Sequence, residues 1–307
     1  MKVMVADKIA ADGIKKLKDG GFEVLSVWEE PKEKLPELIK DCDALIVRSA
    51  TKATKELIDA APGLKVIGRA GVGLDNVDAA HAKSKNIKVV NTPGATSISV
   101  AELAVGLTLA VSRKVALSDR GTRKGEWPKK GGEGIEVHGK NVGLVGLGRI
   151  GRETAKRFRA LGATVRYYDV VRPLPYDEKD WGIEYKPLDE LLSMSDIISI
   201  HVPMTPETKG LLNRERIGKI KKGAILVNTS RGGIVDEAAL AEALKSGALY
   251  GAALDVFETE PLKTSPLFEL DNVVLTPHVG AQTAEGQLRA GVEIAELVMK
   301  ELKALSK

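Results

Sequence analysis

The sequence is poor in the residues that build disulfides, metal sites and proton relays. Among 307 residues there is one cysteine, Cys42, and there are four histidines, at positions 81, 138, 201 and 278. A single cysteine excludes a disulfide framework within the chain and a cysteine-rich metal site. Neither an HExxH motif nor another paired-ligand spacing occurs, so we expect no metal. Proton transfer near neutral pH must therefore depend on very few histidines.

Long hydrophobic runs and blocks of one charge are also missing. The longest apolar stretch, residues 103–112, has ten residues between Glu102 and Arg113, whereas crossing a bilayer needs about 20. The formal charge of +4 arises from 46 basic and 42 acidic residues mixed along the chain, which argues against nucleic acid as a partner. The N-terminus shows no basic segment followed by an apolar run, so we expect a cytoplasmic protein without a membrane partner.

Glutamine is scarce as well, since it occurs only at positions 282 and 287, while lysine and glutamate are abundant. This bias is typical of thermophilic proteins, and we expect a melting temperature above about 60 °C. With 43% hydrophobic and 29% charged residues, the chain has the composition of a globular protein. Its length is sufficient for two domains.

Short apolar runs alternate with helical patterns in the first 90 residues. Strands are expected at residues 3–6, 22–25, 44–47, 65–67 and 87–90, and helices at 9–18, 32–40, 55–61 and 78–85. The alternation predicts a parallel sheet with helices on both faces. Ligands of such sheets bind at the carboxyl ends of the strands, where Arg48 and Ser49 follow one strand and Arg69 with residues 71–73 follows the next. The alternative is that these are ordinary turns with solvated arginines.

A long helix is expected from about residue 97 to 119. Its stretch 103–111 is apolar on nearly all sides, as in helices buried between domains or at a subunit interface, and Gly106 would allow close approach of another backbone. Residues 120–138 are rich in glycine, lysine and proline and predict an ordered arm or a contact with a partner chain. We therefore expect a homodimer in which residues 102–111 and 120–138 form the contact.

The stretch 141–169 predicts a dinucleotide-binding unit. It reads as a strand, the glycine turn Gly146-x-Gly148-x-x-Gly151, a helix, and a second strand that ends at Asp169. Gly146 permits the tight turn, Gly148 lets backbone N–H groups approach a pyrophosphate, and Gly151 allows the helix to pack closely on the strand. The carboxylate of Asp169 can accept both adenosine ribose hydroxyls and disfavours a 2′-phosphate, which indicates NAD as the cofactor.

Six strands are expected in this half of the chain, at residues 142–147, 165–168, 197–202, 224–228, 249–256 and 273–276. The amphipathic helix that starts near residue 283 is expected to return and pack on the first domain. We therefore predict an α/β protein with two doubly wound, parallel-sheet (Rossmann-like) domains. A discontinuous, flavodoxin-like substrate-binding domain comprises residues 1–97 and 283–307, and a NAD-binding Rossmann domain comprises residues 98–282.

Hydride transfer to a 2-oxo acid requires three groups at one place. A cation must hold the substrate carboxylate, an acid must lie beside the carbonyl oxygen, and a carboxylate must keep that acid protonated. Arg231, His278 and Glu260 meet these requirements, because they lie near strand ends expected at one edge of the sheet. His201 follows such a strand too and remains a candidate. The alternatives are a surface ion pair for Arg231 and a turn carboxylate for Glu260.

Seven stretches resemble the D-isomer-specific 2-hydroxyacid dehydrogenases, namely GRAGVGLDNVD, NTPGATSISVAELAVG, VGLVGLGRIGRE, HVPMTPETKGLLN, ILVNTSRGGIVDEAAL, ALDVFETEP and LTPHVGAQT. The resemblance covers nearly the whole chain. It implies that Arg231, Glu260 and His278 are catalytic. It implies a cofactor site lined by Gly146, Gly148, Arg149, Ile150, Gly151, Asp169, His201, Val202, Pro203, Thr208, Thr229, Ser230, Asp255 and His278. The substrate is implied to contact Arg48, Ser49, Arg69, Gly71, Val72, Gly73 and Arg231.

The resemblance is greatest to the branch of the family that oxidises D-3-phosphoglycerate to 3-phosphohydroxypyruvate in serine biosynthesis. Arg48 and Arg69 would supply two permanent cations, which a phosphate would use. If one of them only braces its domain, glyoxylate or hydroxypyruvate becomes the substrate. Val72 departs from relatives that have threonine there, so a hydroxyl contact is lost.

One further expectation follows from the resemblance. Longer members of the family carry a C-terminal regulatory domain, which we expect to be absent because the sequence ends at Lys307, soon after the last expected helix.

The alternative from another functional class is a non-enzymatic NAD-sensing protein, similar to dehydrogenase-like corepressors. An intact acid, its carboxylate partner and a carboxylate-binding arginine are more than sensing requires, and turnover of any 2-oxo acid separates the two.

Overall fold

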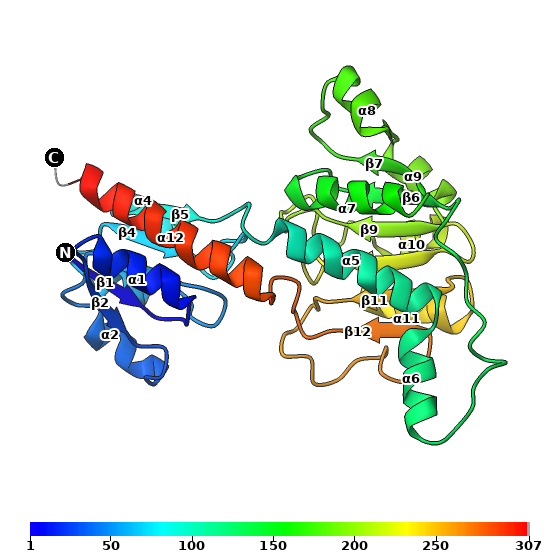
Figure 1. Cartoon of the computed structure of the whole chain (residues 1–307), viewed down its shortest axis with the longest axis horizontal. Helices are drawn as coiled ribbons and strands as arrows, with labels where there is room; N and C mark the ends of the chain where they lie inside the picture. Colours follow the sequence, from blue (N-terminus) through cyan, green and yellow to red (C-terminus); the bar gives the residue numbers. More distant parts are fainter. Residues whose placement is uncertain (306–307) are drawn as a thin grey trace. The chain divides into compact units, whose positions relative to one another are not determined.

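The computed structural model describes residues 1–305, which form two compact units. The first unit contains residues 1–97 and the segment from residue 281 onwards, and the second contains residues 98–280. Each has a parallel sheet with helices on its faces (Figure 1), which confirms the predicted fold class. The second boundary lies two residues before the position expected from the sequence, and residues 306 and 307 of the expected domain lie outside the described residues.

The first unit has a five-stranded sheet in the order β2-β1-β3-β4-β5. Its strands are β1 (Lys2–Val5), β2 (Glu23–Ser26), β3 (Ala44–Val47), β4 (Val66–Arg69) and β5 (Lys88–Asn91). Its helices are α1 (Ala11–Asp19), η1 (Lys32–Lys34), α2 (Leu35–Leu38), α3 (Lys55–Asp59), α4 (Ala79–Ser84) and α12 (Ala284–Ala304). The helix expected at 32–40 is divided into the 3₁₀ turn η1 and α2, since Pro36 near the start of α2 lacks the N–H that would continue a single helix.

The last helix completes the core of the first unit. One face of the sheet is covered by an apolar cluster that includes Ile294 and Val298 of α12, both fully buried. Helices α1 and α12 lie in close contact (blue and red in Figure 1), because a Cβ on Gly13 would lie 2.3 Å from the carbonyl oxygen of Gly291. The predicted return of the final helix to the first domain is therefore confirmed.

The second unit has a seven-stranded sheet in the order β12-β11-β10-β9-β6-β7-β8. Its strands are β6 (Asn141–Val145), β7 (Thr164–Tyr168), β8 (Ile183–Tyr185), β9 (Ile197–Ile200), β10 (Ile225–Asn228), β11 (Gly251–Leu254) and β12 (Val273–Leu275). Its helices are α5 (Ser97–Ser112), α6 (Val115–Arg123), α7 (Arg149–Ala160), α8 (Pro175–Trp181), α9 (Leu188–Met194), α10 (Arg214–Lys219) and α11 (Glu237–Lys245). The strand order reverses between β6 and β9, which is where doubly wound sheets bind dinucleotides.

Helix α8 and strand β8 were not predicted from the sequence. Strand β8 has only three residues, too few for an alternating pattern to be recognised. Contacts distant in sequence stabilise this region, since the rings of Tyr167 and Tyr185 meet edge to face at 5.7 Å and the guanidinium of Arg152 lies 4.6 Å from the centre of the Trp181 ring. The sheet therefore has one strand more than the six that the sequence predicts.

The long helix expected from residue 97 to 119 is also divided. Helix α5 ends at Ser112, Lys114 is left-handed with φ of 49°, and α6 follows. The carbonyl oxygen of Ser112 accepts hydrogen bonds from the Ile135 N–H at 2.8 Å and the Tyr250 hydroxyl at 3.3 Å. Because both donors come from other parts of the chain and satisfy this carbonyl, the helix ends there. Within residues 1–305, no helix is both long and apolar enough to span a membrane.

Candidate active site

The carboxyl edge of β10, β11 and β12 brings an acid–base pair together. Nδ1 of His278 and Oε2 of Glu260 are 2.7 Å apart, and both side chains remain partly exposed, His278 by 46% and Glu260 by 36%. The other oxygen of Glu260 accepts the Phe257 N–H at 3.0 Å, which fixes the carboxylate on the turn that follows β11. Since Nδ1 is directed to Glu260, Nε2 is the His278 nitrogen that can serve a substrate.

The backbone of His278 is held in an unusual conformation. Its φ is 54°, in the left-handed region that residues other than glycine rarely adopt. A turn bond from the His278 N–H to the Thr276 carbonyl, 3.0 Å long, supports this conformation. Such outliers persist only where surrounding contacts enforce them, and they are frequent at functional sites.

Asp255 provides those contacts. Its buried carboxylate accepts the Thr276 hydroxyl at 2.6 Å and the N–H groups of Val279 and Gly280, each at 2.8 Å. The three bonds hold the segment on both sides of His278. The resemblance assigns Asp255 to the cofactor site, and in the structure Asp255 also organises the loop of the proposed acid. Thr276 was missed, although it stands in the quoted motif LTPHVGAQT.

Arg231 lies in the loop after β10 and is tied to the same edge. The Arg231 carbonyl accepts a hydrogen bond from the Asn228 side chain at 2.9 Å, and its Nη1 donates to the Ser230 carbonyl at 2.7 Å. The next residue, Gly232, packs so closely that a Cβ there would lie 1.8 Å from the carbonyl oxygen of Phe257. The arginine loop and the Glu260 turn are therefore in direct backbone contact, and only glycine fits between them.

The glycine turn after β6 has the form that a dinucleotide requires. Gly146 has φ of 103°, and a Cβ on Gly151 would lie 2.3 Å from the Gly146 carbonyl oxygen, so the start of α7 packs tightly on the strand end. Nothing lies within 4 Å of where a Cβ of Gly148 would stand, and no side chain caps the helix at this residue. The first N–H groups of α7 are thus suited to a pyrophosphate. Asp169 accepts the Leu147 N–H at 2.6 Å, which places its carboxylate beside the turn.

His201 lies against this turn but has a different character from His278. Its Nε2 and the Ser199 hydroxyl are 2.9 Å apart, and burial lowers the pKa of His201 to about 3. The ring is therefore neutral at pH 7, which argues against His201 as the acid. Its Nδ1 and the Thr229 hydroxyl are both buried with no hydrogen-bond partner among residues 1–305. Unsatisfied polar atoms at this edge suit a site that receives a polar cofactor.

The other predicted cofactor residues lie at the carboxyl edge of the same sheet. Thr208 closes a turn after β9 by donating from its hydroxyl to the Pro203 carbonyl at 2.6 Å. Ser230, at the end of β10, is buried and donates from its hydroxyl to Oδ1 of Asn228 at 2.7 Å. The remaining members of the set are Val202 after β9, and Arg149 and Ile150 in the first turn of α7.

The predicted substrate residues of the first unit occupy two adjacent strand ends. Val47 of β3 pairs with Arg69 of β4, so Arg48 and Ser49 follow one strand where Arg69 ends the next. The guanidinium of Arg69 folds over its own loop, since a Cβ on Gly71 would lie 1.7 Å from Arg69 Nη1. Val72 and Gly73, which follow in the same loop, are partly buried. The two arginines thus lie at the ends of neighbouring strands, and the guanidinium of Arg69 packs against its own loop.

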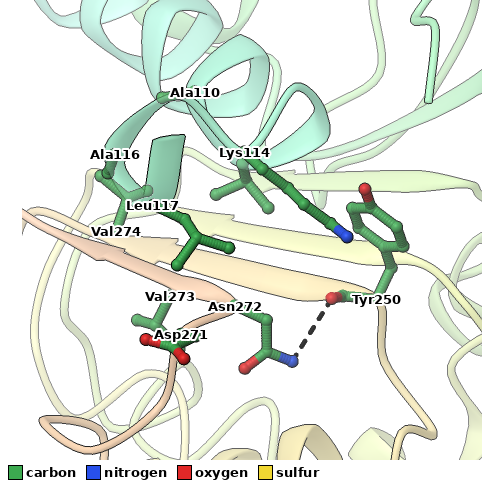
Figure 2. A pocket seen from close by; sticks show the side chains of 10 residues that line it. Ala110, Lys114, Ala116, Leu117, Tyr250, Asp271, Asn272, Val273 and Val274 are labelled. Carbon is green, nitrogen blue, oxygen red and sulfur yellow. Dashed lines mark hydrogen bonds between the residues drawn. The ribbon is translucent and has the colours of Figure 1, made fainter. Parts of the chain in front are cut away.

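A separate pocket lies at the opposite, amino edge of β11 and β12 (Figure 2). It has a volume of about 140 Å³ and is lined mainly by apolar residues of α5, α6 and these strands, including Leu117 and Val273. The ammonium of Lys114 lies 5.9 Å from the centre of the Tyr250 ring, and the Asn272 side chain donates to the Tyr250 carbonyl at 3.3 Å. The pocket therefore belongs to the sheet edge away from Glu260 and His278. No cluster of three metal-ligating side chains occurs in the described part of the chain.

Comparisons with known proteins agree with this arrangement. Residues 105–280 match the model of the D-isomer specific 2-hydroxyacid dehydrogenase, NAD binding domain. The chain is 48% identical over 304 residues to a D-3-phosphoglycerate dehydrogenase of Methanocaldococcus jannaschii, a match that covers 99% of this chain and 58% of the relative. It is 51% identical over 285 residues to a hydroxypyruvate reductase of Thermotoga maritima, covering 91% of this chain and 92% of that protein.

A solved structure extends the likeness to the fold. The TT0316 protein from Thermus thermophilus has a TM-score of 0.90 and 38% identity, over 99% of this chain and 97% of that one. The chain spans little more than half the length of the phosphoglycerate dehydrogenase that it matches and nearly the whole hydroxypyruvate reductase. The matched NAD-binding domain contains the glycine turn, Asp169 and the Glu260–His278 pair. By the family model and by identity over almost its full length, the chain belongs to the D-isomer specific 2-hydroxyacid dehydrogenases.

Proposed function

We propose that the chain is a NAD-dependent D-2-hydroxyacid dehydrogenase in which His278, Glu260 and Arg231 form the catalytic group. The observation that carries the proposal is the 2.7 Å contact between His278 and Glu260 beside the Arg231 loop. An imidazole paired with a carboxylate is suited to donate a proton, and a guanidinium is suited to hold a carboxylate by two parallel bonds. The family membership of the chain supports this reading.

In the direction of reduction, Arg231 binds the carboxylate of the 2-oxo acid and orients its carbonyl group. NADH, when bound at the glycine turn, would supply the hydride for the carbonyl carbon. His278 gives the proton on Nε2 to the carbonyl oxygen as its double bond to carbon becomes single, so that an alcohol forms and the imidazole is left neutral. Glu260 fixes the ring through Nδ1 and stabilises its protonated form. Oxidation of the alcohol follows the same path in reverse, with His278 as the base.

The cofactor assignment depends on residues that fit NAD. The open glycine turn and the uncapped start of α7 would receive the pyrophosphate, and Asp169 would accept the hydroxyls of the adenosine ribose. His201 and Thr229 bring buried polar atoms without protein partners to the same edge. A 2′-phosphate would meet the carboxylate of Asp169, so NADP would bind less well.

We propose 3-phosphohydroxypyruvate and D-3-phosphoglycerate as the substrate pair, in a cytoplasmic enzyme of serine biosynthesis. The placement of Arg48 and Arg69 at neighbouring strand ends supports a phosphate-bearing substrate. Hydroxypyruvate or glyoxylate is the second candidate. Two observations favour it: Arg69 folds over its own loop, and the hydroxypyruvate reductase of Thermotoga maritima matches in both sequence and length.

The test compares kcat/KM for NADH-linked reduction of 3-phosphohydroxypyruvate, hydroxypyruvate and glyoxylate. Charge-assisted contacts from two arginines are worth about 3 kcal/mol or more together, so the phosphate ester should exceed hydroxypyruvate by over a hundredfold. Equal efficiency for hydroxypyruvate and its phosphate ester would replace the proposal with a general hydroxyacid reductase. No turnover of any 2-oxo acid would favour the NAD-sensing alternative.

We also propose that the protein is a homodimer formed through residues 102–111 of α5 and residues 120–138. Helix α5 carries an exposed stripe that includes Glu102, Gly106 and Leu109, and nothing in this chain lies within 4 Å of where a Cβ of Gly106 would be. Trp127 in the arm is 82% exposed, which is unusual for so large an apolar side chain. Light scattering should give twice the chain mass of 32.8 kDa, and a stable monomer would refute the dimer.

A further inference from the structure

Residues 48–51 cross the point where the strand order of the first unit reverses. In the order β2-β1-β3-β4-β5 this point lies between β1 and β3, and ligands of such sheets bind at it. Asp7 follows β1 and residues 48–51 follow β3, so both stand at this crevice. Ser49 and Ala50 are exposed at the tip of the segment, whereas Thr51 is buried. The exposed part is therefore short and firmly attached at its end.

Two side chains hold the backbone of this segment at both ends. Oδ2 of Asp7 accepts the N–H groups of Arg48 at 2.7 Å and Thr51 at 3.0 Å. Nδ2 of Asn76 donates to the carbonyl groups of the same two residues, at 2.7 Å to Arg48 and 2.6 Å to Thr51. A carboxylate thus binds the two donors and an amide nitrogen binds the two acceptors. Position 7 therefore requires a hydrogen-bond acceptor and position 76 a donor, since exchanging donor for acceptor at either position would break both of its bonds.

Asp7 is suited to this task because it stays ionised. Burial acts to raise the pKa of this carboxyl, but hydrogen bonds from the Thr51 hydroxyl and from the Arg48 and Thr51 N–H groups, with the charge of Lys32, hold it below its ordinary value. The Thr51 hydroxyl donates to Oδ1 at 2.6 Å, and the Lys32 ammonium lies 3.2 Å from the same oxygen. Asp7 is 5% exposed, so these bonds are shielded from water.

Asn76 also joins the two loops to which the sequence assigns substrate contacts. It lies in the stretch that follows Gly71–Val72–Gly73, and its carbonyl accepts the Ala53 N–H at 2.8 Å. Its side chain reaches residues 48–51 at the same time. The loop after β3 and the loop after β4 are therefore connected by hydrogen bonds through one asparagine.

We propose that Asp7 and Asn76 are positioning residues that hold residues 48–51 in the substrate-binding conformation before the 2-oxo acid arrives. The inference deepens the proposed function and depends on it. Arg48 and Ser49 then lose little conformational freedom on binding, which strengthens binding without a new contact to the substrate. Loss of either residue should therefore weaken substrate binding and not the chemical step, because the proposed acid–base pair lies in the second unit.

The experiment measures KM for 3-phosphohydroxypyruvate, kcat, and Kd for NADH in Asn76→Asp and Asp7→Asn. Asn76→Asp keeps the shape of the side chain but sets a carboxylate against two carbonyl oxygens. We expect KM to rise about tenfold or more, with kcat and the Kd for NADH little changed. Asn76→Ser, which keeps a hydroxyl donor, should give a smaller rise and guards against a variant that does not fold.

Two control variants make the same Asp-to-Asn and Asn-to-Asp changes at the amino edges of the sheets. Asp43→Asn alters a carboxylate that accepts the Lys2 N–H at 2.8 Å in the wild type. Asn272→Asp alters an amide that donates to the Tyr250 carbonyl at 3.3 Å in the wild type. Both controls should alter stability and leave KM unchanged. A KM rise as large in the controls as in Asn76→Asp, or an unchanged KM in Asn76→Asp and Asp7→Asn, would overturn the inference.

Amide hydrogen exchange gives a readout that needs no turnover. The N–H groups of Arg48 and Thr51 should exchange faster in Asn76→Asp than in wild type, while amides of the β3 strand do not. Unchanged exchange at these two positions would overturn the inference even if the enzyme used another substrate. Absence of wild-type turnover with all three 2-oxo acids would instead defeat the proposed function, so the two failures are distinguishable.

Discussion

Replacing Glu260 with glutamine tests the proposed acid directly. The change removes one negative charge and keeps the shape of the side chain. The amide oxygen can still accept the Nδ1 proton of His278, whereas the amide nitrogen cannot accept the Phe257 N–H, so that bond is lost. When the alcohol is oxidised, His278 takes up a proton and becomes positively charged. Without the nearby carboxylate this charged form is less stable, so kcat/KM for oxidation should fall.

The size of the fall follows from the geometry. Two unit charges 2.7 Å apart interact by about 1.5 kcal/mol at the dielectric constant of water. The water value is appropriate because the side chains of His278 and Glu260 are 46% and 36% exposed. Since about 1.4 kcal/mol corresponds to a factor of ten in rate, kcat/KM for oxidation should fall about tenfold.

The assay records kcat/KM for NAD-linked oxidation of the alcohol substrate at one fixed pH in wild type and Glu260→Gln. Glu258→Gln is a matched control, because it removes the same charge from the same exposed segment two residues away. Its kcat/KM should stay near that of wild type. An unchanged kcat/KM in Glu260→Gln, or an equal fall in both variants, would show that Glu260 does not stabilise the protonated form of His278.

Three other variants or measurements test separate parts of the site. Gly232→Ala would set a Cβ 1.8 Å from the Phe257 carbonyl oxygen, so the Arg231 loop must move by more than about 1 Å and kcat/KM should fall about a hundredfold. Gly218→Ala is the control and should be neutral, because nothing lies within 4 Å of where its Cβ would stand. A fully active Gly232→Ala variant would contradict the packing argument. Asp169→Ala should raise KM for NADH and reduce the preference for NADH over NADPH at least tenfold, which an unchanged ratio of kcat/KM values would disprove. The pKa of His201 is about 3 in the folded chain and near 6.5 in the unfolded chain. Between these values the unfolded chain binds a proton that the folded chain does not. This residue therefore lowers the free energy of unfolding by up to about 1.4 kcal/mol per pH unit as the pH falls from 6.5 to 3. Nitrogen-15 NMR should show that the His201 ring stays neutral at pH 5, and a protonated His201 ring at that pH would refute the assignment.

The parts of the fold that could be predicted are those with local signals. Alternating apolar runs predicted the two parallel sheets, and the spacing of Gly146, Gly148 and Gly151 predicted a turn whose close contacts the structure contains. The catalytic and cofactor roles of the site residues stay predictions, although the structure brings Glu260 and His278 into contact. That pairing was expected because both residues lie near strand ends at one edge of the sheet, and the resemblance to a family supported it; no local rule joins two residues that are 18 positions apart.

The features that were missed depend on contacts between distant parts of the chain. Helix α5 ends at Ser112 because Ile135 and Tyr250 occupy its carbonyl, and neither residue is visible in a window around position 112. Strand β8 forms because β7 already offers an edge with which it can pair. The bonds from Asn76 to Arg48 and Thr51 span 28 and 25 positions and involve a side chain that sequence patterns leave in a loop.

The left-handed backbone of His278 limits how the protein can be made more stable. Among residues 1–305, Asn86, Lys114 and His278 are the positions other than glycine with positive φ. A left-handed residue with a side chain costs about 1–2 kcal/mol, which glycine avoids. Lys114→Gly should therefore raise the melting temperature. Lys114 lies at the pocket on the amino edge of β11 and β12, away from the proposed catalytic group. The same change at position 278 would remove the imidazole, so selection for heat resistance can act at the first site and is blocked at the second.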